Sequence, residues 1–303
     1  MDTAAALQSA LAPHGPEAGA IANLTGVLVA GALAVLVLVM VLAVLALRAP
    51  RPWLARTSAI VAGGIALPGV VLFALLVHAS VVVPRSNPGA AVRVEVVGHQ
   101  WWWEVAYLDA SGKRDFVTAN EIRIPAGQPV ELRLATADVL HSFWVPSLAG
   151  KLDLVPGRAN VLTIAAEAPG LYRGQCAEYC GGPHALMGLH VVAEPPARFE
   201  AWREAQRAPA RTGSSRGRDL FDSLCAGCHT VRGTSAAGQL GPDLTHVASR
   251  VALAAGALPN DAASRSRWIA SSQHVKPGNL MPEYPQLPPG ELAALGDYLA
   301  SLR

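Results

Sequence analysis

Hydrophobic residues are spread unevenly along this 303-residue chain, and the longest apolar runs lie near its beginning. Residues 27–47 form an unbroken apolar run of 21 residues, and residues 60–83 form a second run of 24 with few polar interruptions. A helix needs about 20 apolar residues to cross a bilayer. The pattern therefore predicts two membrane-spanning helices, at about 24–47 and 60–83, in preference to two buried core helices.

The segment between the two predicted helices carries Arg48, Arg51 and Arg56 and no acidic residue. Cytoplasmic loops are enriched in arginine and lysine, so this segment is expected to be cytoplasmic and the rest of the chain after residue 84 to lie outside. The first 20 residues lack a basic region followed by an apolar one, so we do not expect them to be an ordinary signal peptide.

Beyond residue 90 the pattern changes to short segments in which polar and apolar residues alternate. Strands are expected at 92–97, 101–107, 121–124, 131–134, 161–164 and 188–192. Turn-forming sequences lie between them, at 109–112, 125–127, 155–157 and 168–170. Short strands with regular turns predict a β-sandwich or small β-barrel between residues 90 and 195.

The pattern becomes helical again after Pro195 and Pro196. A short exposed helix is expected at 198–208, followed by a linker of small residues, and further helices at 219–225, 268–272 and 291–302. The last of these places its leucines on one apolar face, which is typical of a helix packed in a small domain. We predict an N-terminal segment with a two-helix transmembrane hairpin (1–88), a β-domain (89–195), a linker (196–217) and a compact all-α domain around a cofactor (218–303).

Composition supports this division of the chain. The sequence is 51% hydrophobic, chiefly because of its first quarter, which is typical of a membrane-anchored protein with soluble domains behind the anchor. The net charge is only +2, so no strong positive footprint for nucleic acid is present.

All four cysteines fall in two short sequences. The second of these reads Cys225-Ala-Gly-Cys228-His229, the attachment motif of a c-type haem, in which two thiols form thioethers and the histidine ligates the iron. A carbonyl in the following segment, 241–244, is placed to accept a hydrogen bond from the His229 ring. Met281, on a loop rich in proline and glycine, is the candidate second axial ligand. A zinc site or a redox pair for the cysteines, and a core role for Met281, are the alternatives.

The first cysteine sequence holds Cys176, Cys180, His184 and Met187 within twelve residues. Thiolates, imidazole and thioether form a soft ligand set that suits copper. Two bridging thiolates can hold two copper ions, each of which needs an imidazole. His184 supplies one and His141 is the candidate for the other, with Met187 and the carbonyl of residue 178 as weak axial ligands. The alternatives are a Cys176–Cys180 disulfide and a structural role for His141.

Two resemblances to known families rest on these motifs. Residues 218–303 resemble class I cytochrome c, which implies covalent haem c bound through Cys225 and Cys228, with His229 and Met281 as axial ligands. Residues from about 20 to 192 resemble subunit II of haem–copper cytochrome c oxidases. The matching features are the two-helix hairpin and the sequences Gly-His-Gln-Trp-Trp-Trp (98–103), Asp-Val-Leu-His-Ser-Phe-Trp (138–144) and Gln-Cys-Ala-Glu-Tyr-Cys-Gly-Gly-Pro-His (175–184).

The second resemblance implies a cupredoxin-like β-barrel that carries the binuclear copper centre CuA. The implied copper ligands are His141, Cys176, the carbonyl of Glu178, Cys180, His184 and Met187. The carboxylate of Glu178 would also help to hold a Mg²⁺ ion at the interface with subunit I, and electrons would enter at Trp101. The family often has a carboxylate near the start of the second membrane helix, but residues 56–67 contain no acid. His78, near the outer end of this helix, is interpreted as an interfacial residue and not as a functional one.

The resemblance also implies partners and a location. The chain would be the electron-transfer subunit of a proton-pumping terminal oxidase, with subunit I (haem a and CuB), subunit III and a cytochrome c or other electron donor as partners. It would lie in the bacterial cell (inner) membrane as a multi-pass protein, with both cofactor domains on the periplasmic face. One alternative is the corresponding subunit of a nitric oxide reductase. Another is a copper chaperone or sensor, which does not account for the haem motif.

Overall fold

The computed structural model describes residues 8–49, 52–53, 56–82, 90–211, 213 and 215–303. The chain divides into two compact units. One unit covers residues 17–85, and the other covers residues 1–16 together with 86–303.

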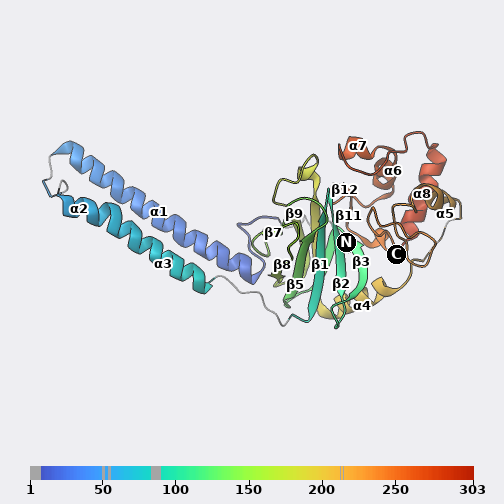
Figure 1. Ribbon diagram of the computed structural model, residues 1–303, viewed down its shortest axis with the longest axis horizontal. Coiled ribbons are helices and arrows are strands. Elements are labelled where there is room, and N and C mark those ends of the chain that lie inside the picture. The colour runs from blue at the N-terminus through green and yellow to red at the C-terminus, as the bar shows by residue number, and fades with distance from the viewer. Residues whose placement is uncertain (1–7, 50–51, 54–55, 83–89, 212, 214) are drawn as a thin grey trace. The chain divides into compact units, whose positions relative to one another are not determined.

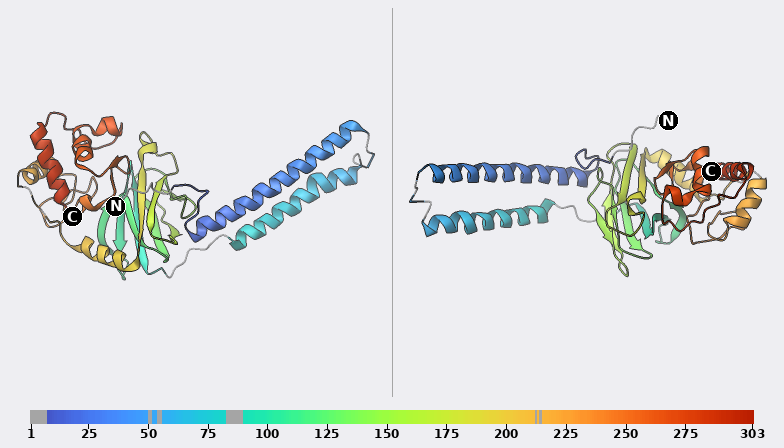
Figure 2. Two further views of the ribbon diagram at one scale, coloured as in Figure 1. Left: turned by 180° about the vertical axis from the view of Figure 1, so that it is seen from behind. Right: turned by 90° about the horizontal axis from the view of Figure 1, so that it is seen from above.

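The smaller unit is a pair of apolar helices that run side by side (Figures 1 and 2). The first is α1 (Pro16–Arg48), and the second is built from α2 (Thr57–Val61), a π-helical turn η1 (Ala62–Ala66) and α3 (Leu67–Val82). Both are long and apolar enough to cross a membrane, and their most apolar segments are not buried inside the structure. The two predicted apolar helices are thus confirmed, and the first begins earlier than expected. The expectations for Arg51, and for residues 83–88, lie outside the described residues.

Two five-stranded sheets form the β-domain of the larger unit (Figure 1). The first has the order β3 (Arg114–Ala119), β2 (Trp102–Leu108), β1 (Val92–His99), β5 (Val130–Thr136), β8 (Asn160–Ile164). The second has the order β4 (Glu121–Pro125), β10 (Gly188–Glu194), β9 (Gly170–Cys176), β6 (His141–Trp144), β7 (Leu152–Leu154). Strands β1 and β5 pair in parallel, as do β4 and β10, and the other pairs are antiparallel.

Alternation along the strands produces the core of this domain. In β1, for example, Val92, Val94 and Val96 are buried and the residues between them are half-buried. Such period-two burial is what the sequence pattern predicted. The six predicted strands are all present, and the fold is the cupredoxin-like one that was expected.

Four strands of the β-domain were not predicted from the sequence: β3, β6, β7 and β9. Strands β6 and β7 are only 4 and 3 residues long, too short to display a period. Strand β9 begins at Gly170 and contains Gly174, and glycine weakens the strand signal. His141 lies on β6 and Cys176 on β9, and β7 pairs with β6, so three of the four missed strands carry or adjoin the copper motif.

Helix α4 (Pro196–Arg207) follows the last strand and packs on the β-domain. The expectation of an exposed helix is wrong for one of its faces. Phe199 is fully buried in the core of the β-domain, and Trp202 packs edge-on against Tyr107 and Phe116. The spacing of Phe199 and Trp202, three residues apart, puts both aromatic rings on the same side of the helix.

The C-terminal domain is helical, as predicted, with α5 (Ser215–Leu224), α6 (Ala262–Ala270), α7 (Ser272–Val275) and α8 (Pro289–Ser301). Phe221 of α5 and Leu295 and Tyr298 of α8 lie at the centre of its apolar core. One feature was not predicted. A short 3-10 turn (Val247–Ser249) leads into a hairpin of β11 (Ala252–Leu253) and β12 (Leu258–Pro259).

Candidate metal and haem sites

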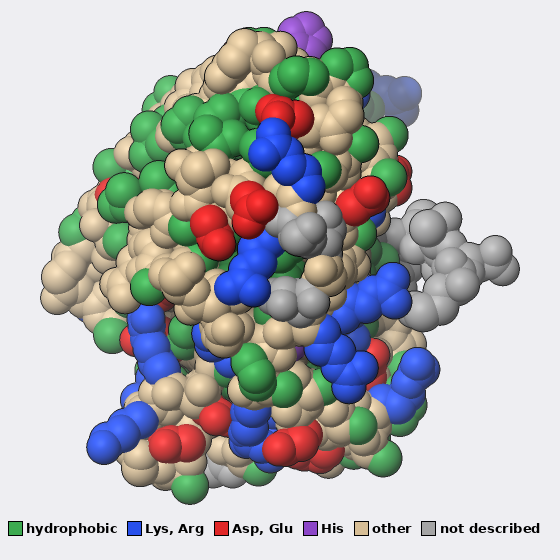
Figure 3. Space-filling view, turned by 90° about the vertical axis from the view of Figure 1, so that its right-hand side faces the viewer, with side chains coloured by type: hydrophobic (Ala, Val, Ile, Leu, Met, Phe, Trp, Pro, Cys, Tyr) green, Lys and Arg blue, Asp and Glu red, His purple; other side chains and the backbone are tan. Residues whose placement is uncertain are grey.

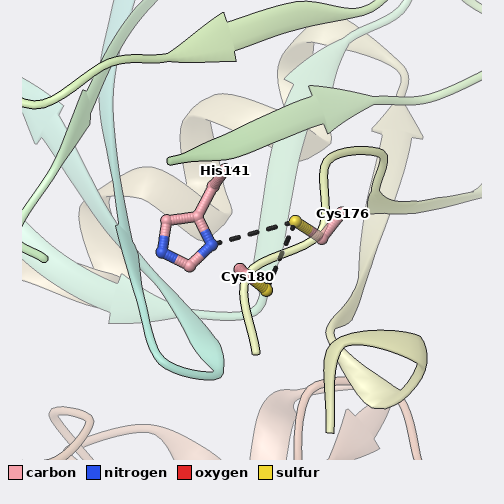
Figure 4. Close-up of side chains that lie close together, drawn as sticks. All are labelled: His141, Cys176 and Cys180. Carbon is pink, nitrogen blue, oxygen red and sulfur yellow. Dashed lines mark hydrogen bonds between the residues drawn. The ribbon is translucent and has the colours of Figure 1, made fainter. Parts of the chain in front are cut away.

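The copper motif is assembled from two neighbouring strands and the loop that follows them. His141 begins β6, Cys176 ends β9, and the two strands are paired. The loop after β9 carries Cys180, passes through a 3-10 turn that begins at His184, and returns to β10 just after Met187. Figure 4 shows His141, Cys176 and Cys180 pointing toward one another.

The six proposed donor atoms form a continuous set of contacts. Cys176 Sγ lies 3.8 Å from Cys180 Sγ, 3.8 Å from His141 Nδ1 and 3.2 Å from the carbonyl oxygen of Glu178. Cys180 Sγ lies 3.4 Å from His184 Nδ1 and 3.8 Å from Met187 Sδ. Both cysteines are free thiols, so the disulfide alternative is excluded in this structure. Each thiol has its own imidazole, and this donor set fits copper.

His141 is held in place by groups that do not face the thiols. Its Nε2 atom lies 2.8 Å from Oδ1 of Asp138, which turns Nδ1 toward Cys176. Gly98 lies against the other side of the ring, where a β carbon would come within 2.8 Å of His141 Cδ2. A buried imidazole fixed by a carboxylate on its outer nitrogen is a common arrangement for metal ligands.

The thiols and the imidazole of the site shift one another's pKa values. Burial opposes ionisation of Cys176, but hydrogen bonds from His141 and from backbone groups lower the pKa of this thiol overall. Burial and the neighbouring Cys176 raise the pKa of Cys180 to about 12. Burial lowers the pKa of His141, but its bonds to Cys176 and Asp138 outweigh this and raise it. Two adjacent thiolates are therefore unfavourable at neutral pH without a metal ion to neutralise them.

Trp101 and Gln100 support the loop that carries Cys180. Trp101 Nε1 and Gln100 Nε2 both donate to the carbonyl oxygen of Cys180, at 3.0 and 2.7 Å. The indole proposed as the point where electrons enter thus contacts the backbone of a proposed copper ligand. The carboxylate of Glu178 is partly exposed, and one of its oxygens lies 3.7 Å from Lys151 Nζ.

The haem motif follows α5 directly. The backbone N–H groups of Cys225 and His229 donate to Phe221 and Cys225 carbonyls, so the motif continues the helical turn. His229 Nδ1 donates to the carbonyl oxygen of Pro242 at 2.8 Å, which leaves Nε2 free for iron. This confirms the hydrogen bond expected from segment 241–244. Burial lowers the pKa of His229, which favours the neutral imidazole that ligates a metal.

Glycine and backbone contacts shape the rest of the haem site. A β carbon at Gly241 would lie 2.6 Å from His229 Cε1, so only glycine leaves room for the ring. Met281 is partly buried against the domain core, and its backbone is fixed on both sides. Its N–H donates to Asn279 Oδ1 at 2.8 Å, and its carbonyl accepts from Ser272 Oγ at 2.9 Å.

Sequence reasoning named the donor residues but missed their supports. Asp138 was part of a matched motif without a role, and Gly98 and Gln100 were not assigned one. Asp138 could have been found, because a carboxylate three residues before a candidate ligand can reach its ring. The role of Gly98 depends on a contact between β1 and β6, two strands of different sheets, which a local pattern does not reveal.

The architecture defines a class of protein. Along the sequence, two apolar helices are followed by a cupredoxin-like domain and then by a helical domain with a haem c motif. This order of domains is that of a membrane-anchored protein that binds copper and haem c. Residues 107–194 match the family described as cytochrome C oxidase subunit II, periplasmic domain, and residues 214–303 match the cytochrome c family. The chain belongs to the cytochrome c oxidase subunit II family.

Two bacterial relatives document this membership. Cytochrome c oxidase subunit 2 of Bacillus sp. (strain PS3) is 31% identical over 254 residues, which cover 79% of this chain and 70% of the relative. The subunit of Alkalihalophilus pseudofirmus is 40% identical over 217 residues, which cover 70% of this chain and 61% of that protein. The chain thus spans 61 to 70% of the length of these relatives.

Among solved structures, the periplasmic domain of subunit II of cytochrome oxidase (CoxB) of Bradyrhizobium japonicum is similar at 30% identity and a TM-score of 0.37. The match covers 40% of this chain and 96% of that domain. A chain of a heme-copper terminal oxidase dimer matches at 23% identity and a TM-score of 0.33, covering 44% of this chain and 97% of that one.

Proposed function

We propose that this chain is the electron-transfer subunit of a proton-pumping terminal cytochrome c oxidase. Electrons from a cytochrome c donor would pass through haem c and the CuA centre to subunit I, where O2 is reduced to water. The observation that carries the proposal is the convergence of two thiols, two imidazole nitrogens, a thioether and a carbonyl oxygen in one cluster, of which His141, the thiols and the thioether are buried. A domain with the haem c motif and its histidine already oriented follows in the same chain.

The residues of the copper site suit a carrier of electrons. His141, Cys176, Glu178 (through its carbonyl), Cys180, His184 and Met187 would hold two copper ions, which when bound can share one electron. Cys176, Cys180 and Met187 are each at most 5% exposed, and His141 is fully buried. Burial and fixed hydrogen bonds exclude water and keep the ligands in place, so little has to move when the charge changes.

The residues of the haem site also suit a carrier. Cys225 and Cys228 would form the thioethers, and His229 and Met281 would be the axial ligands. Ligation by histidine and methionine raises the reduction potential and occupies both axial positions. The backbone contacts at His229 and Met281 hold both ligands, so this domain is proposed to pass electrons and not to bind oxygen.

The partners and location follow from the same proposal. The two apolar helices would span the bacterial cell (inner) membrane, with both cofactor domains on the periplasmic face and with subunits I and III as neighbours. Glu178 would contribute its carboxylate to a Mg²⁺ ion at the interface with subunit I. On the face shown in Figure 3, basic and acidic side chains are interspersed. This face therefore offers a donor no surface of a single charge.

Spectroscopy of the purified complex tests the two sites. We expect a near-infrared and EPR signature of a mixed-valence dicopper centre, together with the absorbance of haem c. Cys176→Ser or Cys180→Ser should abolish the copper signature while the haem absorbance stays. A type-1 mononuclear copper spectrum in the unsubstituted protein would refute the two-copper assignment.

Measurements of substrate consumption test which terminal electron acceptor the complex reduces. The purified complex should consume O2 when it is supplied with a reduced cytochrome c. The nitric oxide reductase alternative is not favoured, because the relatives are named as cytochrome c oxidase subunits. Consumption of nitric oxide without consumption of O2 would nevertheless establish it against our proposal.

A further inference from the structure

Lys276 is a buried lysine at the contact between the haem domain and the copper domain. It follows α7, is 3% exposed, and donates from Nζ to the carbonyl oxygen of Trp101 at 2.6 Å. The carbonyl oxygen of Ala254, at the tip of the β11–β12 hairpin, lies 3.4 Å from the same nitrogen. Among the described residues no carboxylate forms an ion pair with it. Burial lowers the pKa of Lys276 to about 7.

A lysine in this position is difficult to explain by stability alone. Lysine is almost never fully buried without a charged partner, because removing its ammonium group from water is costly. An apolar side chain of similar length would fill the same space without that cost. Only a hydrogen-bond donor, however, can make a directed contact with the backbone carbonyl of Trp101.

On the haem side, Lys276 is tied to the proposed axial methionine through one residue. Asn279 Nδ2 donates to the carbonyl oxygen of Lys276 at 2.8 Å, and Asn279 Oδ1 accepts from the N–H of Met281, also at 2.8 Å. The segment from Lys276 to Met281 is thus internally braced. A displacement of Lys276 would be transmitted to the loop that presents Met281.

On the copper side, Trp101 connects the same contact to Cys180. The carbonyl of Trp101 accepts from Lys276, while its indole Nε1 donates to the carbonyl oxygen of Cys180 at 3.0 Å. Four hydrogen bonds and the residues between them therefore form a continuous connection from Met281 to the Cys180 loop.

The β11–β12 hairpin makes a second contact beside the first. The carbonyl oxygen of Ala255 accepts from the N–H of Gly188 at 2.9 Å, and Gly188 directly follows the proposed ligand Met187. The turn is made by Ala254, Ala255 and Gly256, all with positive φ (52°, 59° and 81°). Such a turn aims the carbonyls of Ala254 and Ala255 at Lys276 and Gly188.

Two side chains of β4 anchor the base of the hairpin. Glu121 Oε2 accepts from the N–H of Val251 at 2.6 Å, and Arg123 Nη2 donates to the carbonyl oxygen of Ser249 at 3.0 Å. The hairpin is therefore bonded to the copper domain at its base and at its tip. The hydrogen bond from Lys276 to the Trp101 carbonyl is a further contact between the two domains.

We propose that Lys276 is a positioning residue for electron transfer between the two cofactors. It holds the loop of the haem ligand Met281 against Trp101, so that the tethered haem domain docks in one orientation. The inference rests on the proposed function, because it assigns the docked arrangement to the step between haem c and CuA. A tether raises the effective concentration of a domain but does not orient it. Orientation requires directed contacts, and misplacement by about 1 Å can slow a reaction by about 100-fold.

The test compares Lys276→Met with Lys113→Met in the complete oxidase complex. Methionine keeps the length and fills the buried space without the donor, and Lys113 is an exposed lysine of the copper domain in the turn between β2 and β3. Transfer from haem c to CuA is measured after rapid reduction of the haem, and deuterium uptake is measured for peptides that include Gly188. Absorbance of both centres shows that the sites are intact.

For Lys276→Met we expect transfer to slow at least tenfold and Gly188, which donates across the contact, to exchange faster. Lys113→Met should change neither. Lys276→Arg, which keeps a donor, should transfer faster than Lys276→Met. Unchanged transfer, or unchanged exchange at Gly188, in Lys276→Met overturns the positioning role. Absence of haem-to-copper transfer in the unsubstituted complex refutes the proposed function itself, and with it the role of Lys276.

Discussion

The Nε2 atom of His141 lies 2.8 Å from Oδ1 of Asp138, and this bond points the other ring nitrogen at Cys176. Asp138 itself is held by the backbone N–H groups of Gln100 and Val139, at 2.7 and 2.6 Å. The orientation of the buried imidazole is thus set by a carboxylate that is held by the β1–β2 turn and by the backbone of its own loop.

Removing the charge of Asp138 should weaken copper binding without unfolding the domain. In Asp138→Asn the copper affinity is expected to fall by about 10- to 100-fold, because the outer carboxylate no longer fixes the tautomer and orientation of His141. Competition with a copper chelator measures the effect. Asp297→Asn, at an exposed position of α8, is the matched control and should leave the affinity unchanged. Equal affinity in the two variants would argue against the orienting role.

Adding a single methyl group at Gly98 should displace the ring from its other side. The new β carbon of Gly98→Ala would meet His141 Cδ2 at 2.8 Å and Cγ at 3.0 Å, and the buried ring has no free space. We expect a loss of about 1–3 kcal/mol in the free energy of unfolding and a distorted copper spectrum. At Gly290 an added β carbon meets nothing within 4 Å. Gly290→Ala should therefore leave the spectrum unchanged, and an undisturbed spectrum in Gly98→Ala would contradict the steric argument.

Helix α4 should contribute to the stability of the β-domain. Phe199 is fully buried, so Phe199→Ala is expected to cost about 3–5 kcal/mol of unfolding free energy through lost contacts and a cavity. Arg198→Ala changes the exposed neighbour on the same helix and should cost little. Denaturant unfolding followed by tryptophan fluorescence compares the two. Similar unfolding midpoints for the two variants would show that the helix does not stabilise the domain.

His190 should make the protein sensitive to mild acid. Burial, aided by Arg173, lowers the pKa of His190 to about 4, below its ordinary value of 6.5. Between these values the unfolded chain binds a proton that the folded chain does not, so stability is complete above pH 6.5 and falls as the pH drops toward 4. The contribution at pH 5 is about 2 kcal/mol.

The His190→Gln variant removes this titration. Its free energy of unfolding should change less between pH 7 and pH 5 than that of the unsubstituted protein, by about the 2 kcal/mol given above. His274, an exposed histidine of the haem domain, provides the control variant His274→Gln. If His274→Gln reduced the acid sensitivity as much as His190→Gln, burial of His190 would not be its cause.

The candidate ligands of both sites could be predicted from the sequence, but most of the contacts that position them could not. Cys176, Cys180, His184 and Met187 lie within twelve residues, and the haem motif is contiguous, so their local spacing was sufficient. His141 lies 35 residues before Cys176, and its assignment depended on the resemblance of its surrounding motif. The short strand β6 that delivers it has no readable period.

The contacts between the domains were beyond the reach of local patterns. Lys276 and Trp101 are 175 residues apart, and Glu121 and Val251 are 130 apart. The β11–β12 hairpin, with strands of two residues each, leaves almost no signal in the sequence. Helix α4 was found, but its buried face was missed because Phe199 and Trp202 are the only two large apolar side chains in a segment with five charged ones.

Several of the contacts that hold the cofactor residues have main-chain carbonyls as acceptors: Pro242 for His229, Cys180 for Trp101 and Trp101 for Lys276. Replacing the side chain of an acceptor residue leaves its carbonyl in place. An alanine scan of this chain would therefore detect the donor of each pair and overlook its partner, unless the replacement also shifted the backbone. Mapping both partners requires chemistry that alters the peptide bond itself, such as replacing an amide by an ester.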